Sequence, residues 1–185
     1  MLIDARHSLL LLIDLQTRLA PAVDRAEACV ARCRQLVDAA RKLTVPILAT
    51  EHCPEGVGPT VPALKQRLSG SEVVEKRHFN GLAEPVLRDA LAAHGRRTVV
   101  VAGMEAHVCV LQTVLGLKEG GYEPKVVADA VASRAPSSRE LALGRMRHHG
   151  VDIVNAEMVM FEWLKSADNP AFKEVLAMIK SGPSD

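Results

Sequence analysis

Short runs of apolar residues alternate along this chain with longer segments in which apolar residues recur every three or four positions. The runs have the length and composition of strands that are buried on both faces, and the longer segments have the period of helices with one buried side. Ser8–Asp14 is the first run, and Thr98–Gly103 is the clearest β-branched run. Six runs are predicted to be strands: 8–14, 46–50, 72–76, 98–103, 125–128 and 151–154.

The segments between and after these runs are predicted to be helices, and the Pro- and Gly-rich segment 53–62 a loop. Asp24 can cap the first helix, whose apolar positions continue to Leu43. Strands that alternate with helices predict right-handed crossovers and a parallel sheet between helices, which is the α/β class. Helices are expected at about 24–43, 85–94, 107–119, 137–149, 157–165 and 170–180.

Length and composition predict a single packed domain over residues 1–185. The chain has 185 residues, of which 48% are hydrophobic and 24% charged, so a sizeable core is available. Aromatic residues make up only 3%, and the core must therefore be aliphatic. We find no repeat and no linker that would justify a second domain.

The net charge and the spacing of the cysteines indicate which partners and which cellular location to expect. The formal net charge is +1, with Lys and Arg spread along the chain, so no nucleic acid or membrane partner is expected. The apolar run Leu9–Ile13 is too short to span a membrane. Cys29, Cys33, Cys53 and Cys109 form no CxxC pair, which favours reduced thiols and a cytoplasmic location. We expect a small-molecule substrate.

Three reactive side chains stand where predicted strands end, and ligands bind at the carboxyl ends of strands in such sheets. Asp14 follows the first strand, Lys76 follows the third, and Cys109 lies in the first turn of the helix after the fourth. A thiol at a helix start lies near free backbone N–H groups and the positive end of the helix dipole. We therefore expect its pKa to fall below the ~8.5 of an ordinary cysteine.

Each of these residues also has an ordinary structural interpretation. Asp14 could cap a helix, Lys76 could be solvated, and Cys109 could be a packed core thiol. His52 beside Cys53 could form a metal or redox pair, although the Pro and Gly around them suit a loop. Sequence spacing alone leaves these alternatives open.

The chain resembles the isochorismatase-like, or cysteine hydrolase, family. The resemblance implies a six-stranded parallel sheet in a three-layer α/β/α sandwich, an Asp-Lys-Cys triad on Asp14, Lys76 and Cys109, and a homo-oligomer. It rests on five stretches that occur in family order: Leu11–Gln16, Thr50–Thr60, Glu75–Phe79, Gly103–Val110 and Ala128–Arg134.

The same resemblance implies a mechanism. Asp14 takes the proton of the Cys109 thiol, the thiolate adds to an amide-like carbonyl, and Lys76 supports the charge of the pair. Water then releases the acyl-enzyme. The resemblance also implies a cis peptide at Met104–Glu105, with the backbone N–H groups of Glu105 and Cys109 forming the oxyanion hole.

Departures from the family pattern limit the substrate and the cofactor. Nicotinamidase-type members have an Asp-x-His metal motif after the second strand, where this chain has Thr50–Cys53, so neither a metal nor another cofactor is expected. Members that cleave the enol ether of isochorismate lack Cys109. The residues expected to bind substrate are Gln16, His78, Phe79 and His107.

The leading prediction is a metal-independent cysteine hydrolase that cleaves a small amide or related C–N bond through a Cys109 acyl-enzyme. The alternative is a non-catalytic binding or scaffold protein that retains the fold. Redox sensing by Cys109 is a third interpretation, which predicts a resolving cysteine nearby; sequence order does not exclude Cys53 from that role. The apolar residues Phe161, Trp163 and Phe172 are a candidate interface between copies, or they pack on their own sheet.

Overall fold

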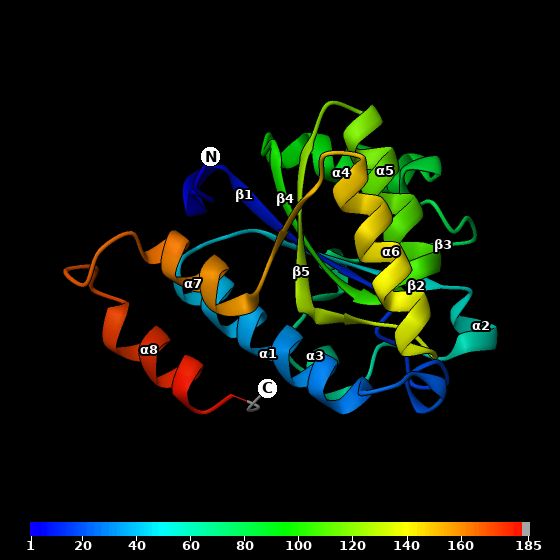
Figure 1. Ribbon diagram of the computed structural model, residues 1–185, viewed down its shortest axis with the longest axis horizontal. Coiled ribbons are helices and arrows are strands. Elements are labelled where there is room, and N and C mark those ends of the chain that lie inside the picture. The colour runs from blue at the N-terminus through cyan, green and yellow to red at the C-terminus, as the bar shows by residue number, and fades with distance from the viewer. Residues whose placement is uncertain (183–185) are drawn as a thin grey trace.

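Six parallel strands form one sheet in the order β3-β2-β1-β4-β5-β6 in the computed structural model, which describes residues 1–182 (Figure 1). Helices cover both faces, so the three-layer α/β/α sandwich is confirmed. The strands are β1 (Ser8–Ile13), β2 (Ile47–His52), β3 (Val73–Lys76), β4 (Thr98–Met104), β5 (Glu123–Ala132) and β6 (Asp152–Val154).

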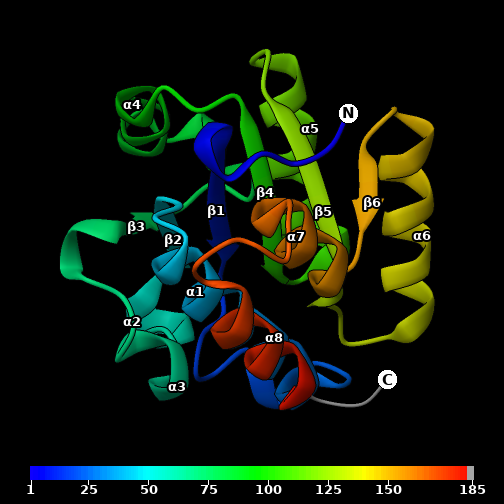
Figure 2. The same ribbon diagram turned by 90° about the vertical axis from the view of Figure 1, so that its left-hand side faces the viewer.

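Helices α1 and α7 pack on one face of the sheet, with α8 against them, and α4, α5 and α6 pack on the other (Figure 2). The long helices are α1 (Ala26–Lys42), α4 (Pro85–His94), α5 (Leu111–Glu119), α6 (Pro136–His148), α7 (Ala156–Leu164) and α8 (Phe172–Lys180). The short ones are α2 (Pro54–Val57), α3 (Pro62–Lys65), a π-helical turn (Ala106–Val110) and 3-10 turns at Ala5–His7, Ala20–Ala22, Gly70–Glu72 and Gly81–Ala83.

The apolar run of β1 is continuous because both faces of this central strand are buried. Leu10 and Leu12 join the core on the side of α1, whereas Leu9, Leu11 and Ile13 join the core on the side of α5. All six residues of the strand are buried. The run therefore stabilises both layers at once, which is the pattern expected of a strand inside a parallel sheet.

The strand order reverses between β1 and β4, and this point defines the crevice where ligands bind in such sheets. The chain proceeds outward from β1 through β2 to β3 and then returns to β4 on the other side of β1. Ile13 pairs with Thr50 of β2 and with Gly103 of β4. Residues that directly follow β1 and β4 are thereby placed side by side.

Two sequence predictions about element ends are wrong. Asp24 does not cap α1: Arg25 occupies the N-cap with a left-handed backbone (φ 54°), while the Asp24 N–H donates to the carbonyl of Ser133. The fifth strand continues to Ala132 instead of stopping at Ala128, because a register shift against β4 lets it pass through the polar Asp129. The segment predicted as a loop contains α2.

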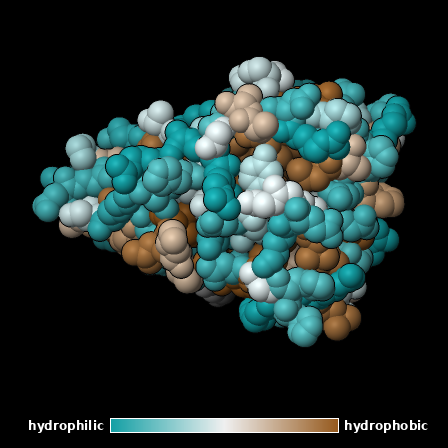
Figure 3. Space-filling view, turned by 90° about the horizontal axis from the view of Figure 1, so that it is seen from above, coloured by the Kyte–Doolittle hydropathy of each residue, from teal (hydrophilic) through white to brown (hydrophobic). Residues whose placement is uncertain are grey.

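The apolar C-terminal segment packs mainly on its own sheet. Trp163 is 2% exposed, and Phe172 is partly buried against the same core. Phe161 remains exposed, so only this residue is available to a partner. The face seen in Figure 3 is mostly hydrophilic with small separate apolar groups. A homo-oligomer stays a prediction. Across residues 1–182 we find no helix with the length and apolar character needed to cross a bilayer.

Gly103 allows β4 to approach β1 closely. Its φ is 135°, and a Cβ there would lie 2.1 Å from the carbonyl oxygen of Ile13. Gly103→Ala is therefore expected to lower the free energy of unfolding by at least about 3 kcal/mol, because it adds backbone strain and a backbone clash. Urea denaturation measures this effect. Gly144→Ala in α6 is the control: it meets no atom within 4 Å and should raise stability by about 0.5–1 kcal/mol.

Candidate active site

The structure brings together the three residues predicted at strand ends. Asp14 follows β1, Lys76 ends β3, and Cys109 lies in the π-helical turn after β4. The Asp14 Oδ2 and Lys76 Nζ atoms are 2.7 Å apart. The Cys109 sulfur, a carboxylate oxygen of Asp14 and a ring nitrogen of His52 lie within 4.8 Å of one another. An acid, a cation, an imidazole and a thiol therefore share one site.

The Asp14 carboxylate is held at both oxygens. Oδ1 accepts a 2.6 Å hydrogen bond from the Thr50 hydroxyl, and Oδ2 faces the Lys76 ammonium. The backbone at Asp14 is left-handed (φ 50°), and its N–H donates to the carbonyl of Thr50. The carboxylate is 1% exposed. Its position is thus set by the end of β2 on one side and by β3 on the other.

The Lys76 ammonium is buried, and three acceptors surround it. Its side chain is 0% exposed, and Nζ lies 2.7 Å from Asp14 Oδ2 and 3.2 Å from the carbonyl of His78, to which it donates. The third neighbour is Nδ1 of His52 at 3.4 Å, the long end of the hydrogen-bond range. The ammonium therefore has an ion-pair partner in Asp14, an acceptor in the carbonyl of His78, and an imidazole nitrogen within hydrogen-bond range.

Burial raises the pKa of the Cys109 thiol to about 12, with Asp14 raising it further and Lys76 lowering it. The expectation of a lowered pKa is therefore wrong, because the loss of solvent around a 7% exposed sulfur outweighs the favourable charges. Cys109 is a neutral thiol at physiological pH. A nucleophile of this kind needs a base within reach, and Asp14 is the carboxylate beside it.

The backbone before Cys109 has the form that the family resemblance implies. The Met104–Glu105 peptide is cis, so that prediction is confirmed. The carbonyl of Glu105 accepts from the N–H groups of Val108 and Val110.

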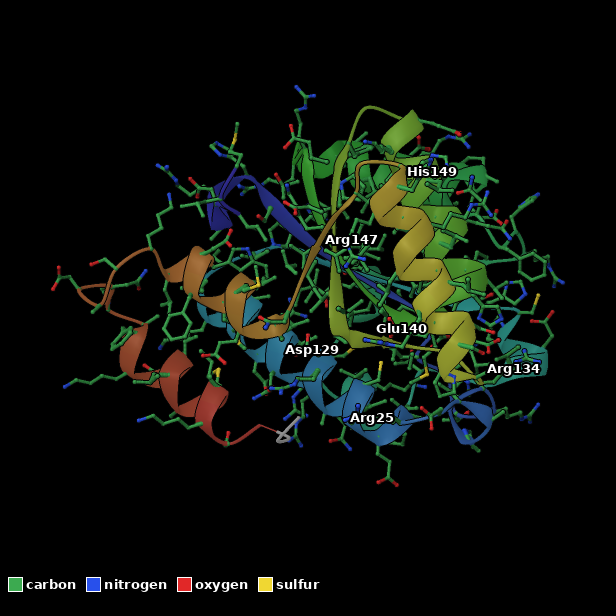
Figure 4. All side chains as sticks on the ribbon, in the orientation of Figure 1. Arg25, Asp129, Arg134, Glu140, Arg147 and His149 are labelled. Carbon is green, nitrogen blue, oxygen red and sulfur yellow. The ribbon has the colours of Figure 1, made fainter. Side chains whose placement is uncertain are left out.

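The Glu105 carboxylate accepts hydrogen bonds of 2.9 and 2.8 Å from the Arg134 guanidinium. Arg134 follows β5 and is labelled in Figure 4. The hydrogen bond with Arg134 holds the pKa of Glu105 below the ordinary value. This ion pair fixes the segment that leads from β4 to the thiol.

The residues expected to bind substrate differ in how near they lie to the triad. The Phe79 ring is half exposed and packs on His52 at a centroid distance of 5.2 Å. The His78 ring points instead to Glu84 at 2.8 Å, although its carbonyl reaches Lys76. His107 is partly buried, with Nδ1 3.0 Å from the Ser133 hydroxyl.

Gln16 is buried, and its amide is engaged with the main chain. Nε2 donates to the carbonyls of His52 at 3.0 Å and Gly58 at 2.6 Å, and Oε1 accepts from the His52 N–H at 2.8 Å. Both hydrogen-bonding groups of the His52 backbone are held in this way. Gln16 is thus placed to position His52, and contact with a substrate would require these bonds to open.

His52 is a site residue that the sequence pattern does not single out. The Pro and Gly that follow it suit a loop, but His52 ends β2, the strand between β1 and β3. The predicted strand stopped at Thr50 because Glu51 and His52 are polar. The signal that could have found it is the one that found Asp14: a reactive side chain at the carboxyl end of a strand.

Asp14, His52 and Cys109 have the side chains and the spacing of a three-ligand metal site. Lys76 already places a positive charge 2.7 Å from Asp14 and 3.4 Å from His52. A metal ion would have to displace this ammonium from its acceptors. We therefore assign no metal to these residues.

All four cysteines are free thiols. Cys29 and Cys33 are buried in α1, with their sulfurs 3.2 and 3.6 Å from the carbonyl of Ala130. They pack in the core, as their spacing predicts. Cys53 is partly buried at the start of α2.

Comparison with known proteins gives a consistent result. The sequence profile of the isochorismatase domain matches residues 8–158. Isochorismatase domain-containing protein 2A of Mus musculus is 36% identical over 179 residues, which covers 96% of this chain and 85% of that protein. Isochorismatase domain-containing protein 2 of Xenopus laevis is 34% identical over 183 residues, covering 97% and 87%.

Two solved structures have the same fold. The MAR1 ribonuclease from Caenorhabditis elegans is 35% identical, with a TM-score of 0.93 and coverage of 100% of this chain and 95% of that one. YcaC from Pseudomonas aeruginosa, solved with hexane-2,5-diol and covalent acrylamide, is 26% identical, with a TM-score of 0.89 and coverage of 96% and 91%.

Proposed function

Because this chain belongs to the isochorismatase domain family, we propose that it is a hydrolase in which the Cys109 thiol attacks the carbonyl carbon of a small amide or related C–N bond. The observation that carries the proposal is the buried Asp14–Lys76 ion pair beside the thiol. Buried charges are costly unless they are paired, so a pair placed against a nucleophile is a sign of catalysis.

The first half of the reaction transfers one proton and forms one bond. Asp14 accepts the proton of Cys109 as the sulfur adds to the carbonyl carbon. As the proton moves to Asp14, negative charge passes to the sulfur, and Lys76 stabilises it there because it lowers the pKa of the thiol. The tetrahedral intermediate then collapses, the C–N bond breaks, and Asp14 returns the proton to the leaving nitrogen. The amine departs and an acyl group remains on Cys109.

The second half releases the acid. Asp14 takes a proton from water, and the resulting hydroxide adds to the thioester carbonyl. Collapse of this intermediate expels the Cys109 sulfur, which recovers the proton from Asp14. The backbone N–H groups of Glu105 and Cys109 are proposed to stabilise the oxyanion in both halves. Lys76 is not suited to that task because its three donors face Asp14, His52 and the carbonyl of His78.

The comparison with YcaC supports access of a small amide-bearing molecule to a nucleophile on this fold. That protein holds covalent acrylamide, which is an unsaturated amide that reacts with nucleophilic side chains, thiols above all. An amide can therefore reach a nucleophile on this fold. For the present chain we propose Cys109 as that nucleophile, with Lys76 as the positive charge beside it.

A second candidate activity comes from the C. elegans relative, which is named as a ribonuclease. RNA cleavage would need a surface that accepts a phosphate backbone. The Cys109 sulfur is nearly closed from solvent, and the net charge of the chain is +1. These observations favour the small amide.

The proposal is tested with a panel of small primary amides and an RNA oligonucleotide, with release of ammonia and strand cleavage as the readouts. We expect ammonia release from at least one amide, with a rate unchanged after dialysis against EDTA. RNA cleavage without amide turnover would replace the proposal with the ribonuclease function. No turnover, together with a Cys109 that does not react with acrylamide, would favour the non-catalytic binding or scaffold protein.

A further inference from the structure

His52 is held in a fixed position beside both Asp14 and Lys76. It ends β2, and Gln16 binds both its N–H and its carbonyl. Its ring packs on Phe79 on one side. A ring nitrogen lies within 4.8 Å of the Cys109 sulfur and of an Asp14 oxygen. The hydrogen bonds to the main chain and the packing of the ring on Phe79 together fix the orientation of the imidazole.

The imidazole lies within hydrogen-bond range of the buried Lys76 ammonium. Asp14 Oδ2 is the ion-pair partner of the ammonium at 2.7 Å, and the carbonyl of His78 accepts a hydrogen bond from it at 3.2 Å. The ammonium also faces Nδ1 of His52 at 3.4 Å. The Lys76 side chain is fully buried, so water cannot take the place of this acceptor without opening the site.

We propose that His52 is a positioning residue that, in its neutral form, holds the Lys76 ammonium against Asp14 by accepting a hydrogen bond at Nδ1. This inference rests on the proposed function, in which Lys76 stabilises the charge on Asp14 and on the sulfur. With Nδ1 as acceptor, the proton of the neutral ring resides on Nε2. His52 thus acts through Lys76 and needs no contact with substrate.

The role requires an uncharged ring, and the surroundings favour that form. Burial, and then the positive charge of Lys76, lower the pKa of His52 below its ordinary value. Arg77 acts in the same direction, whereas Asp14 and Glu55 oppose it. Protonation at Nδ1 would remove the acceptor and place two cations 3.4 Å apart. The ammonium would then be pushed away from the site as the pH falls.

The test measures how fast acrylamide alkylates Cys109, by mass spectrometry of the full-length protein and its peptides. At neutral pH, His52→Leu should slow alkylation about tenfold or more, because it leaves a buried N–H of Lys76 without an acceptor. His52→Gln should stay within about threefold of the unaltered protein, since its amide oxygen can accept the same bond. At about pH 5 the unaltered protein should lose rate relative to His52→Gln, which has no ring to protonate.

Two controls separate the possible outcomes. His148→Leu removes an exposed histidine at the end of α6 and should leave the alkylation rate unchanged. Melting temperatures of all variants show whether a slow variant is folded. The inference is overturned if His52→Leu alkylates at the unaltered rate, or if a folded His52→Gln is as slow as His52→Leu.

Asp14→Asn distinguishes failure of this inference from failure of the proposed function. If Asp14→Asn slows alkylation while His52→Leu does not, only the role of His52 is wrong. If neither variant slows it, Cys109 does not depend on the Asp14–Lys76 pair, and the proposed mechanism fails as well.

Discussion

Cys109→Ala should reduce turnover of a responsive amide by at least about 10⁴-fold, because it removes the atom that forms the covalent intermediate. The remaining groups can still bind the substrate, so the loss should appear in kcat more than in KM. Steady-state kinetics on the amide with the highest rate measures both. Mass spectrometry should at the same time show that the acyl adduct is absent.

The fold should survive this substitution, since the side chain loses a single buried sulfur atom. Cys53→Ala is the matched control: this thiol is also free and only partly buried at the start of α2. Its turnover should stay within about twofold of the unaltered enzyme. Substantial turnover in a pure, folded Cys109→Ala preparation would exclude the acyl-enzyme.

Asp14→Asn should lower the free energy of unfolding by about 3–5 kcal/mol, because it leaves the Lys76 ammonium buried without its counterion. The two side chains are 1% and 0% exposed, so solvent cannot compensate. Urea denaturation followed by circular dichroism measures the loss. Turnover should fall in the same variant, since an amide cannot accept the thiol proton.

The double variant Asp14→Asn/Lys76→Met should recover part of this stability, because it removes the unpaired charge. Turnover should not recover. Glu55→Gln is the control for the loss of an ion pair as such: Glu55 and Arg77 also lie 2.8 Å apart, but at 58% and 76% exposure. Its effect on stability should be small beside that of Asp14→Asn, because solvent screens the exposed pair. An equal cost at the two sites would mean that Asp14 and Lys76 are more solvated than the structure indicates.

The sequence allowed the strands to be predicted where burial on both faces produces an unbroken apolar run. β1 and β4 are such strands, and their predicted bounds differ from the observed ones by one residue. β5 was predicted too short because Asp129 interrupts its apolar run at the register shift. The cap at Asp24 was wrong because α1 begins one residue later than predicted, with Arg25 at the N-cap in the left-handed region.

The site was predictable as a set of residues but not as an electrostatic environment. Asp14, Lys76 and Cys109 follow from one rule about strand ends. The direction of the thiol pKa does not, because it depends on how much solvent the surrounding layers exclude from the sulfur. His52 was not predicted for a related reason. The Pro and Gly next to this histidine suggest a loop, and only the paired strands show that it lies beside Asp14 and Lys76.

The order of the strands in the sheet has a consequence for the newly made chain. β1, β2 and β3 lie on one side of the sheet and carry Asp14, His52 and Lys76, whereas the sulfur arrives later with β4 on the opposite side of β1. A fragment that ends before β4 holds every charged partner and no nucleophile. Cys109 is therefore the last of the four site residues to be synthesised, and a product that ends before β4 has the ion pair but no thiol beside it.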